Sequence, residues 1–182
     1  MQKEGSVVRQ TIIAMMEDKP GALNQVVSLF RRRKCNIESL AVGHSEVTGL
    51  SRMTVVAEGD RGSVDHIVTC LDKLINVIEV TNVTDEPSVD RELALIKVSA
   101  SSSARYKITQ LVDIFRARVI DVATESLTVE ITGTEDKIES LIELLRPFGI
   151  KEMVRTGRVA MLRGETVAAN VSMPTYSVAQ PA

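Results

Sequence analysis

The strongest constraint on the fold is an internal repeat of helical apolar patterns. Apolar residues spaced i, i+3, i+4 and i+7, as on the buried face of a helix, occur in two segments. The first segment has Leu23, Val26, Val27 and Phe30, and the second has Ile108, Leu111, Val112 and Phe115. A later pattern also occurs twice, as Val64, Ile67, Val68 and Leu71 and as Ile138, Leu141, Ile142 and Leu145. The chain is therefore predicted to contain two copies of one unit.

The spacing of the repeat predicts where the copies differ. The first helices stand 85 positions apart (23 to 108), and the second helices stand 74 apart (64 to 138). The second copy is thus expected to lack 11 residues between its first helix and its third strand. We expect the missing residues to come from the hairpin around 44–49, because loops tolerate length changes best.

Segments with strand character separate the helices and complete the order βαββαβ in each copy. Strands are predicted at 7–16, 36–44, 50–58, 77–83, 92–99, 119–124, 127–132 and 150–156, and helices at 22–34, 63–74, 104–116 and 135–145. This α+β order is that of the ferredoxin-like unit, an antiparallel sheet with two helices on one face. We expect one domain over 1–84 and a second over 85–164. A Pro-containing acidic link at 84–90 joins them, and a flexible tail follows at 165–182.

Composition limits the classes of function. The 182 residues carry a net charge of −2, only 3% aromatics and no Trp, so a nucleic-acid surface is not expected. Cys35 and Cys70 form no C-x-x-C pair, and His44 and His66 are isolated, so neither a metal site nor a catalytic residue is expected. No signal peptide or membrane-length apolar run is evident, and a cytoplasmic protein is expected. The basic run 31–34 ends the first predicted helix and favours a solvated helix end.

The stretch E-D-K-P-G-A-L at 17–23 is the best candidate for recognition. A Pro-Gly turn that begins a helix leaves backbone N–H groups unpaired, and the helix dipole attracts a carboxylate to them. Gly21 permits close approach of a ligand, and Asp18 attracts a cation. The turn therefore suits a zwitterion that carries an acid and an amine. At the 85-residue spacing, Ser103, Arg105 and Tyr106 stand opposite Asp18, Pro20 and Gly21, so the second copy is not expected to bind the same ligand.

Several ordered motifs resemble the ACT domain family, and more specifically the small regulatory subunits of acetolactate synthase. They are E-D-K-P-G-A-L at 17–23, N-I-E-S-L at 36–40, L-S-R-M-T at 50–54, R-E-L-A-L-I-K-V at 91–98 and G-R-V-A-M-L-R-G at 157–164. The resemblance implies an ACT domain over 1–84 and an ACT-like domain over 85–164 that contacts the catalytic subunit. It further implies a chain without catalysis or cofactor of its own. The catalytic partner would use thiamine diphosphate, FAD and magnesium.

The resemblance also implies a site and an effector. Small subunits of this family activate the catalytic subunit and confer feedback inhibition by valine or another branched-chain amino acid. Two chains pair through their ACT domains, and the effector lies at their interface. Carried over by position, the site is Asp18, Pro20, Gly21, Ala22 and Leu23 of one chain with Asn36 and Ile37 of the other.

The resemblance implies a role for each of these residues, and two of the residues also have a simpler explanation. The amides of Gly21 to Leu23 would bind the effector carboxylate, Asp18 and Asn36 its ammonium, and Leu23 and Ile37 its aliphatic side chain. Asp18 stands where many members carry Asn, which puts effector preference in doubt. Asp18 could instead only favour the first helical turn electrostatically, and Asn36 could only follow a helix end.

Apolar residues on both faces of the first strand, such as Ile12 and Ile13, favour at least a dimer. Three other functions remain open at this point. One is an amino-acid sensor for a different enzyme. The second is an RNA-binding module of the same βαββαβ order, which the lack of aromatics on 50–55 disfavours. The third is a stand-alone enzyme, for which no nucleophile–base pair is evident.

Overall fold

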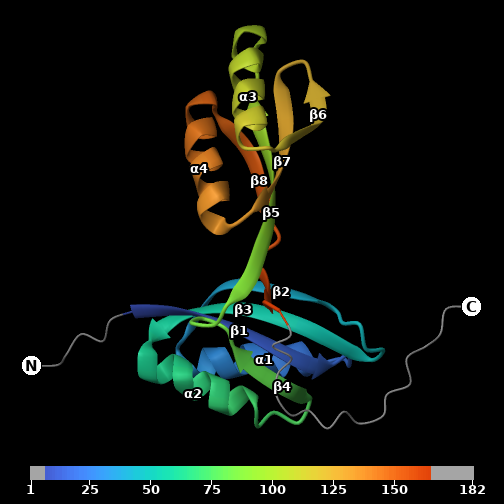
Figure 1. Cartoon of the computed structure of the whole chain (residues 1–182), viewed down its shortest axis with the longest axis vertical. Helices are drawn as coiled ribbons and strands as arrows, with labels where there is room; N and C mark the ends of the chain where they lie inside the picture. The colour runs from blue at the N-terminus through green and yellow to red at the C-terminus, as the bar shows by residue number, and fades with distance from the viewer. Residues whose placement is uncertain (1–6, 165–182) are drawn as a thin grey trace, which may run out of the picture. The chain divides into compact units, whose positions relative to one another are not determined.

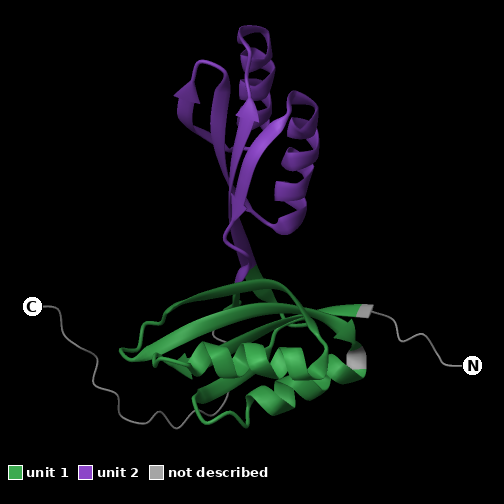
Figure 2. Cartoon of the chain, turned by 180° about the vertical axis from the view of Figure 1, so that it is seen from behind, with its two compact units in different colours: residues 1–89, 160–182 green, residues 90–159 purple. Residues whose placement is uncertain are grey.

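The computed structural model describes residues 7–164, which form two compact units (Figures 1 and 2). The first unit holds residues up to Val89 together with the described residues from Ala160, and the second holds Asp90–Val159. The sequence placed the boundary at 84/85. The structure divides the chain five residues later and returns residues after 159 to the first unit. The predicted tail at 165–182 lies outside the described residues.

The first unit is one antiparallel sheet with two helices. Its elements are β1 (Val7–Glu17), α1 (Ala22–Arg33), β2 (Asn36–His44), β3 (Leu50–Asp60), α2 (Arg61–Leu71) and β4 (Val77–Asn82). The strand order is β2-β3-β1-β4, so β2 is an edge strand. This is the predicted ferredoxin-like order. Figure 1 shows α1 and α2 together on one face of this sheet.

Alternation along the strands builds the core of the first unit. Ile12 and Ala14 of β1 and Val55 of β3 point to the helices and are fully buried, because side chains two apart on a strand share a face. Val26 and Phe30 of α1 close over them. The helix face differs from the prediction in one respect. Its buried residues are Ala22, Val26, Leu29 and Phe30, whereas Leu23 and Val27 each keep 39% of their surface exposed.

The other face of the first sheet has an unpredicted strand. β9 (Val159–Leu162) pairs with the start of β5 (Ser88–Ser99), and Arg163 N–H donates to Pro87 O at 2.8 Å. Ala160 packs on Ile13 and Val83 in a small apolar cluster to which Leu162 also belongs. Arg52 donates to the Ala160 carbonyl at 3.3 Å. The first unit therefore includes residues from the far end of the described chain.

The second unit repeats the order of elements. Within β5 the chain passes from the first unit into the second, and α3 (Ser102–Ile114), β6 (Arg118–Ala123), β7 (Ser126–Gly133), α4 (Glu135–Leu145), a 3₁₀ turn (Arg146–Phe148) and β8 (Ile150–Arg155) follow. The strand order is β6-β7-β5-β8, the same as in the first unit. Ile96, Val129, Ile108 and Leu141 form the centre of its core and are fully buried. The predicted α+β fold of two tandem ferredoxin-like units is confirmed.

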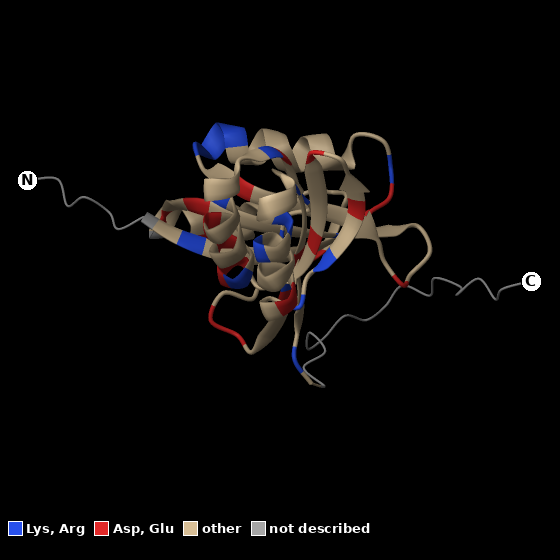
Figure 3. Ribbon diagram, turned by 90° about the horizontal axis from the view of Figure 1, so that it is seen from above, with Lys and Arg blue, Asp and Glu red and all other residues tan. Residues whose placement is uncertain are grey.

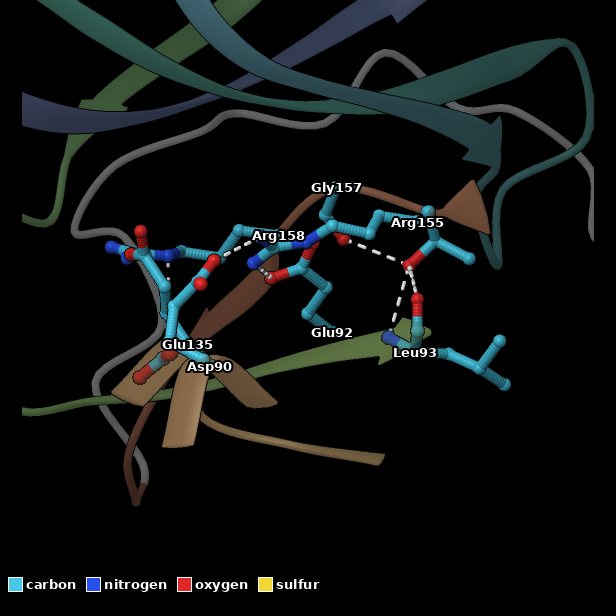
Figure 4. Close-up of polar contacts among 9 residues, drawn as sticks. Asp90, Glu92, Leu93, Glu135, Arg155, Gly157 and Arg158 are labelled. Carbon is cyan, nitrogen blue, oxygen red and sulfur yellow. Dashed lines mark hydrogen bonds and ion pairs between the residues drawn. The ribbon is translucent and has the colours of Figure 1, made fainter. Parts of the chain in front are cut away.

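Two arginines tie the ends of the second unit together (Figure 4). Arg155 donates twice to Glu92, at 2.6 and 2.8 Å, and also to Glu139 of α4. Arg158 pairs with Glu135 at 2.5 Å and with Asp90 at 3.9 Å. The hydrogen bonds to Glu92, which is 8% exposed, raise the pKa of the Arg155 guanidinium. The network joins the first residues of the unit to its last ones.

The structure corrects the register of the repeat. Lys34 and Arg116 both adopt left-handed backbone after the first helix of their unit, with φ of 55° and 52°. The β-bulges after Ile37 and Val119 also match. Both pairs stand 82 positions apart, so the predicted spacing of 85 is wrong. Its error arose because exposed Leu23 was aligned with buried Ile108, whose true counterpart is Val26.

The corrected register changes the counterparts of the turn. Gly21 stands opposite Ser103, and Leu23 stands opposite Arg105. The predicted pairings of Asp18 with Ser103, Pro20 with Arg105 and Gly21 with Tyr106 are therefore wrong.

Corresponding strands of the two units are separated by a different number of residues than corresponding helices are. This difference shows which connections differ in length between the units. Val8 pairs with Gly59 as Glu92 pairs with Gly133, so β1 and β5 stand 84 positions apart. The connection from the first strand to the first helix is therefore two residues longer in the first unit. The second helices keep the spacing of 74, so the hairpin segment is longer by eight residues rather than the predicted 11. Its predicted location is confirmed, because residues 45–49 join β2 to β3 whereas only 124–125 join β6 to β7.

Candidate functional site

The turn between β1 and α1 forms an open helix N-terminus. Gly21 is the residue before the helix, with φ of 88°, a left-handed conformation that favours glycine. A Cβ at this position would meet no heavy atom within 4 Å, so the space beside it is free. No side chain caps the helix, and its first turn carries no acid. This geometry leaves room for a ligand against the backbone.

The amides of this turn are only partly used. Ala22 N–H donates to Lys19 O at 3.2 Å, so one of the three predicted donors already has an acceptor. The amides of Gly21 and Leu23 form no hydrogen bond within the part of the chain that the structure describes. Two donors therefore remain for an anion at the positive end of the helix dipole.

The β2–β3 hairpin reaches the turn and holds it. Asp18 N–H donates to Gly49 O at 2.8 Å, and Glu17 N–H donates to Asn76 O at 2.8 Å. The Asp18 carboxylate has a partner that the sequence did not indicate, since its Oδ2 lies 3.2 Å from His44 Nδ1 at the end of β2. The prediction that His44 is isolated is therefore wrong, because His44 lies beside the turn.

These contacts bring together the two places where the first unit is longer than the second. The strand–helix connection has two more residues and the hairpin segment eight more, and they meet at Asp18. The second unit has the same fold without these extra residues, so the fold does not require them. The meeting of both elaborations makes this end of the first sheet the candidate functional site.

The structure does not bring Asn36 and Ile37 to this turn within one chain. Asn36 pairs with Glu58, which in turn pairs with Arg9, whereas the turn begins after Glu17. Eight residues along β1 correspond to roughly 25 Å. Asn36 is exposed and Ile37 partly buried against the core. A site that uses both groups requires a second chain, as the resemblance implies.

Other chemistry is sparse among residues 7–164. No group of three or more His, Cys, Asp or Glu side chains there is arranged to hold a metal ion. Burial raises the pKa of the Cys35 thiol, and the nearby Asp60 adds to the effect. Hydrogen bonds from Ser63 lower the pKa of Asp60, which caps α2. Acidic and basic residues are interspersed along the elements (Figure 3), and no described helix is long and apolar enough to cross a bilayer.

Comparison with known proteins decides the family. The chain is 51% identical over 157 residues to a probable acetolactate synthase small subunit of Archaeoglobus fulgidus, covering 86% of this chain and 98% of that protein. The chain belongs to the acetolactate synthase small subunit family. Family models describe residues 12–79 as an AHAS small subunit-like ACT domain and 91–164 as the small subunit of acetolactate synthase.

Further comparisons agree with this family. An acetolactate synthase small subunit of Mycobacterium bovis is 50% identical over 154 residues, covering 85% of this chain and 92% of that protein. The crystal structure of the acetolactate synthase small subunit from Thermotoga maritima matches with a TM-score of 0.79 and 39% identity. It covers 86% of this chain and 98% of that one. As a small subunit, the chain has a catalytic large subunit as its partner.

Proposed function

We propose that this chain activates the catalytic subunit of acetolactate synthase and makes it sensitive to a branched-chain amino acid, with valine as the first candidate. The observation that carries the proposal is the open turn before α1, with a left-handed Gly21 and two amides that have no hydrogen bond to any residue of 7–164. These donors suit the effector carboxylate. The turn belongs to the unit that has the longer hairpin.

Apolar side chains beside the turn favour an aliphatic effector. Leu23 exposes 39% of its surface directly after the open amides, and Val27 one helical turn later exposes the same fraction. A single methylene changes binding by only about 1–3 kcal/mol. Valine, leucine and isoleucine are therefore expected to differ in affinity by no more than roughly 10–200-fold, and the family's inhibitor need not be the best ligand here.

A second copy of the chain would complete the site. Among the described strands β2 lies at the edge of its sheet, and edge strands are ready positions for pairing with another chain. Asn36 and Ile37 on β2 are too far from the turn of their own chain to serve it. We propose a homodimer of ACT domains in which Asn36 and Ile37 of one copy complete the pocket at Asp18, Pro20, Gly21, Ala22 and Leu23 of the other.

The second unit would serve the catalytic partner. It keeps the fold, and at the corrected register it has Ser103 and Arg105 in place of Gly21 and Leu23. We propose that residues 85–164 contribute to contact with the catalytic subunit and that residues 1–84 sense the effector. Thiamine diphosphate, FAD and magnesium would all be bound by the catalytic subunit.

The proposal is tested by mixing the purified chain with a cognate catalytic subunit. Acetolactate formation from pyruvate is measured with and without valine, leucine or isoleucine. We expect no turnover by the chain alone, higher turnover by the mixture than by the catalytic subunit, and inhibition by at least one of the three amino acids. A mixture whose rate matches that of the catalytic subunit in every condition would contradict the proposal.

The division of labour needs its own experiment. Residues 90–159 are replaced by a short Gly-Ser linker that joins Val89 to Ala160, so that β9 residues stay with the first unit. We expect valine to bind this variant with its original affinity while activation of the catalytic subunit weakens. Full activation by the variant would contradict the role proposed for the second unit.

A further inference from the structure

The pair formed by Asp18 and His44 has no evident role in stability. Asp18 Oδ2 and His44 Nδ1 lie 3.2 Å apart, yet 86% of the His44 side chain and 47% of the Asp18 side chain are exposed. Exposed polar contacts of this kind contribute little to folding, typically below about 1 kcal/mol. The pair joins β2 to the turn before α1, where the proposed effector site lies. The Asp18–His44 pair is therefore more relevant to binding than to folding.

Asp18 without a partner would interfere with an anion site three residues away. Asp side chains readily accept hydrogen bonds from backbone N–H groups two or three residues further on, as in Asx-turns and helix caps. Pro20 has no N–H, so the first such donor after Asp18 that is free is that of Gly21. A carboxylate at Gly21 would occupy the donors that an effector carboxylate needs.

Among the charged and polar groups near the turn, His44 is the one that contacts the Asp18 carboxylate. Glu17 is paired with Lys19 at 3.0 Å, so these two neighbours on the turn balance each other. The backbone of Asp18 is already fixed by Gly49, and only its side chain remains to be directed. The imidazole of His44 does this from the end of β2, beside the β2–β3 loop that is longer than its counterpart in the second unit.

We propose that His44 is a positioning residue for the effector site. It holds the Asp18 carboxylate beside the hairpin and keeps it away from the backbone amides at the N-terminus of α1. This inference rests on the proposed function. It explains how a chain with Asp at this position keeps an anion-binding turn open. His44 itself does not contact the effector.

The test is a double-mutant cycle with valine as the probe, measured by calorimetry on the full chain. We expect His44→Ala to weaken valine binding about fivefold, the effect of losing roughly 1 kcal/mol. In an Asp18→Ala background the same change should alter affinity less than twofold, because alanine has no side-chain acceptor that could compete for the donors. His66→Ala, the chain's other histidine and an exposed residue of α2, is the matched control and should change nothing.

A second readout follows the turn itself. Without valine, the backbone amide resonance of Gly21 should shift in His44→Ala as Asp18 becomes its acceptor, and should stay unchanged in His66→Ala. Valine binding that is equal in the parent and in His44→Ala would overturn this inference and leave the proposed function intact. Equal weakening in both backgrounds would also overturn it. If the parent binds no branched-chain amino acid, both proposals fail.

Discussion

The two units of this chain share one scaffold and differ at one end of it. Both have the strand order of a ferredoxin-like sheet, a left-handed residue after the first helix and a bulge three to four residues later. Only the first has the longer turn before its first helix and the longer hairpin that contacts it. Because the second unit folds without these features, they are not required by the architecture. The comparison thus separates residues that build the fold from residues available for binding.

The units also differ in the interactions that hold their terminal residues in place. The first gains a strand from the far end of the described chain, whose Ala160 packs on Ile13 and Val83. The second uses charges, with Arg155 and Arg158 joining its first and last residues. The candidate binding turn and the contacts that join the ends of each unit are therefore distinct differences between the units.

The largest effect is expected from a charge at the open turn. Gly21→Asp places a carboxylate where the effector carboxylate is proposed to bind and should weaken valine binding at least about a hundredfold, a loss of roughly 2.7 kcal/mol. The space beside Gly21 is free, so the substitution does not crowd the core, but a φ of 88° strains any L residue there. Gly21→Asn carries the same strain without the charge and should weaken valine binding far less. Calorimetry measures the affinity, and circular dichroism checks the fold.

The matched control lies in the other unit. Ser103 stands opposite Gly21 at the corrected register and is exposed in the first turn of α3. Ser103→Asp should leave valine affinity within twofold. Similar losses in both variants would break the comparison, because the two turns would then be functionally equivalent.

Arg155→Met should produce the largest change in stability. It removes both hydrogen bonds to Glu92, whose carboxylate is nearly buried and would be left without its partner. Arg155 is itself about one-quarter exposed, so we expect a loss of about 2 kcal/mol rather than the 3–5 of a fully buried pair. Hydrogen exchange should show faster exchange in β5 and β8 and unchanged exchange in β3.

The exposed pair of Lys97 and Glu152, 3.8 Å apart in the same unit, supplies the control. Lys97→Ala is expected to change stability by less than about 0.5 kcal/mol. An equal effect of the two substitutions in urea unfolding would show that the Arg155 network is no stronger than a surface ion pair.

Leu162→Ala tests whether β9 belongs to the first unit. Leu162 is half-buried on the cluster of Ile13 and Val83, so its truncation should destabilise the first unit by about 1 kcal/mol. Met161, 59% exposed on the same strand, is the control, and Met161→Ala should have almost no effect. Thermal unfolding detects the difference. Indistinguishable midpoints for the two variants would exclude a packing role for the strand.

The smallest effect concerns a core position that the two units fill differently. Cys35 is buried, and the corresponding residue of the second unit is Ala117. Cys35→Ala should cost less than about 1 kcal/mol, since it removes one sulfur atom from the core. In the parent, a thiol reagent at pH 8 should modify Cys70 well before Cys35, because burial raises the pKa of the Cys35 thiol and reduces its thiolate. Equal rates would contradict this burial.

The sequence predicted most of the fold because both units show regular apolar periodicity. Its errors come from features that periodicity does not report. Leu23 looks like a core residue but lies on the flank of α1, and aligning it with Ile108 shifted the repeat by three positions. β9 was missed because a four-residue strand has no clear pattern, and its burial depends on a distant partner.

The candidate site was found only in part. The Pro-Gly turn was evident from local chemistry, and the hairpin was located from the repeat lengths. The contact of His44 with Asp18 depends on the β1–β3 and β2–β3 registers, in which Glu17 lies opposite Leu50 and His44 opposite Ser51. The distance between Asn36 and the turn follows from the same registers, which no single segment of sequence encodes.

The most direct test of the account is valine inhibition of the complete enzyme assembled with three versions of this chain. Acetolactate formation is titrated with valine for the parent, Gly21→Asp and Ser103→Asp, each mixed with the same catalytic subunit. We predict that all three activate the catalytic subunit, that the parent and Ser103→Asp are inhibited alike, and that Gly21→Asp resists valine. Inhibition of Gly21→Asp at the valine concentrations that inhibit the parent would contradict the assignment of sensing to the turn of the first unit.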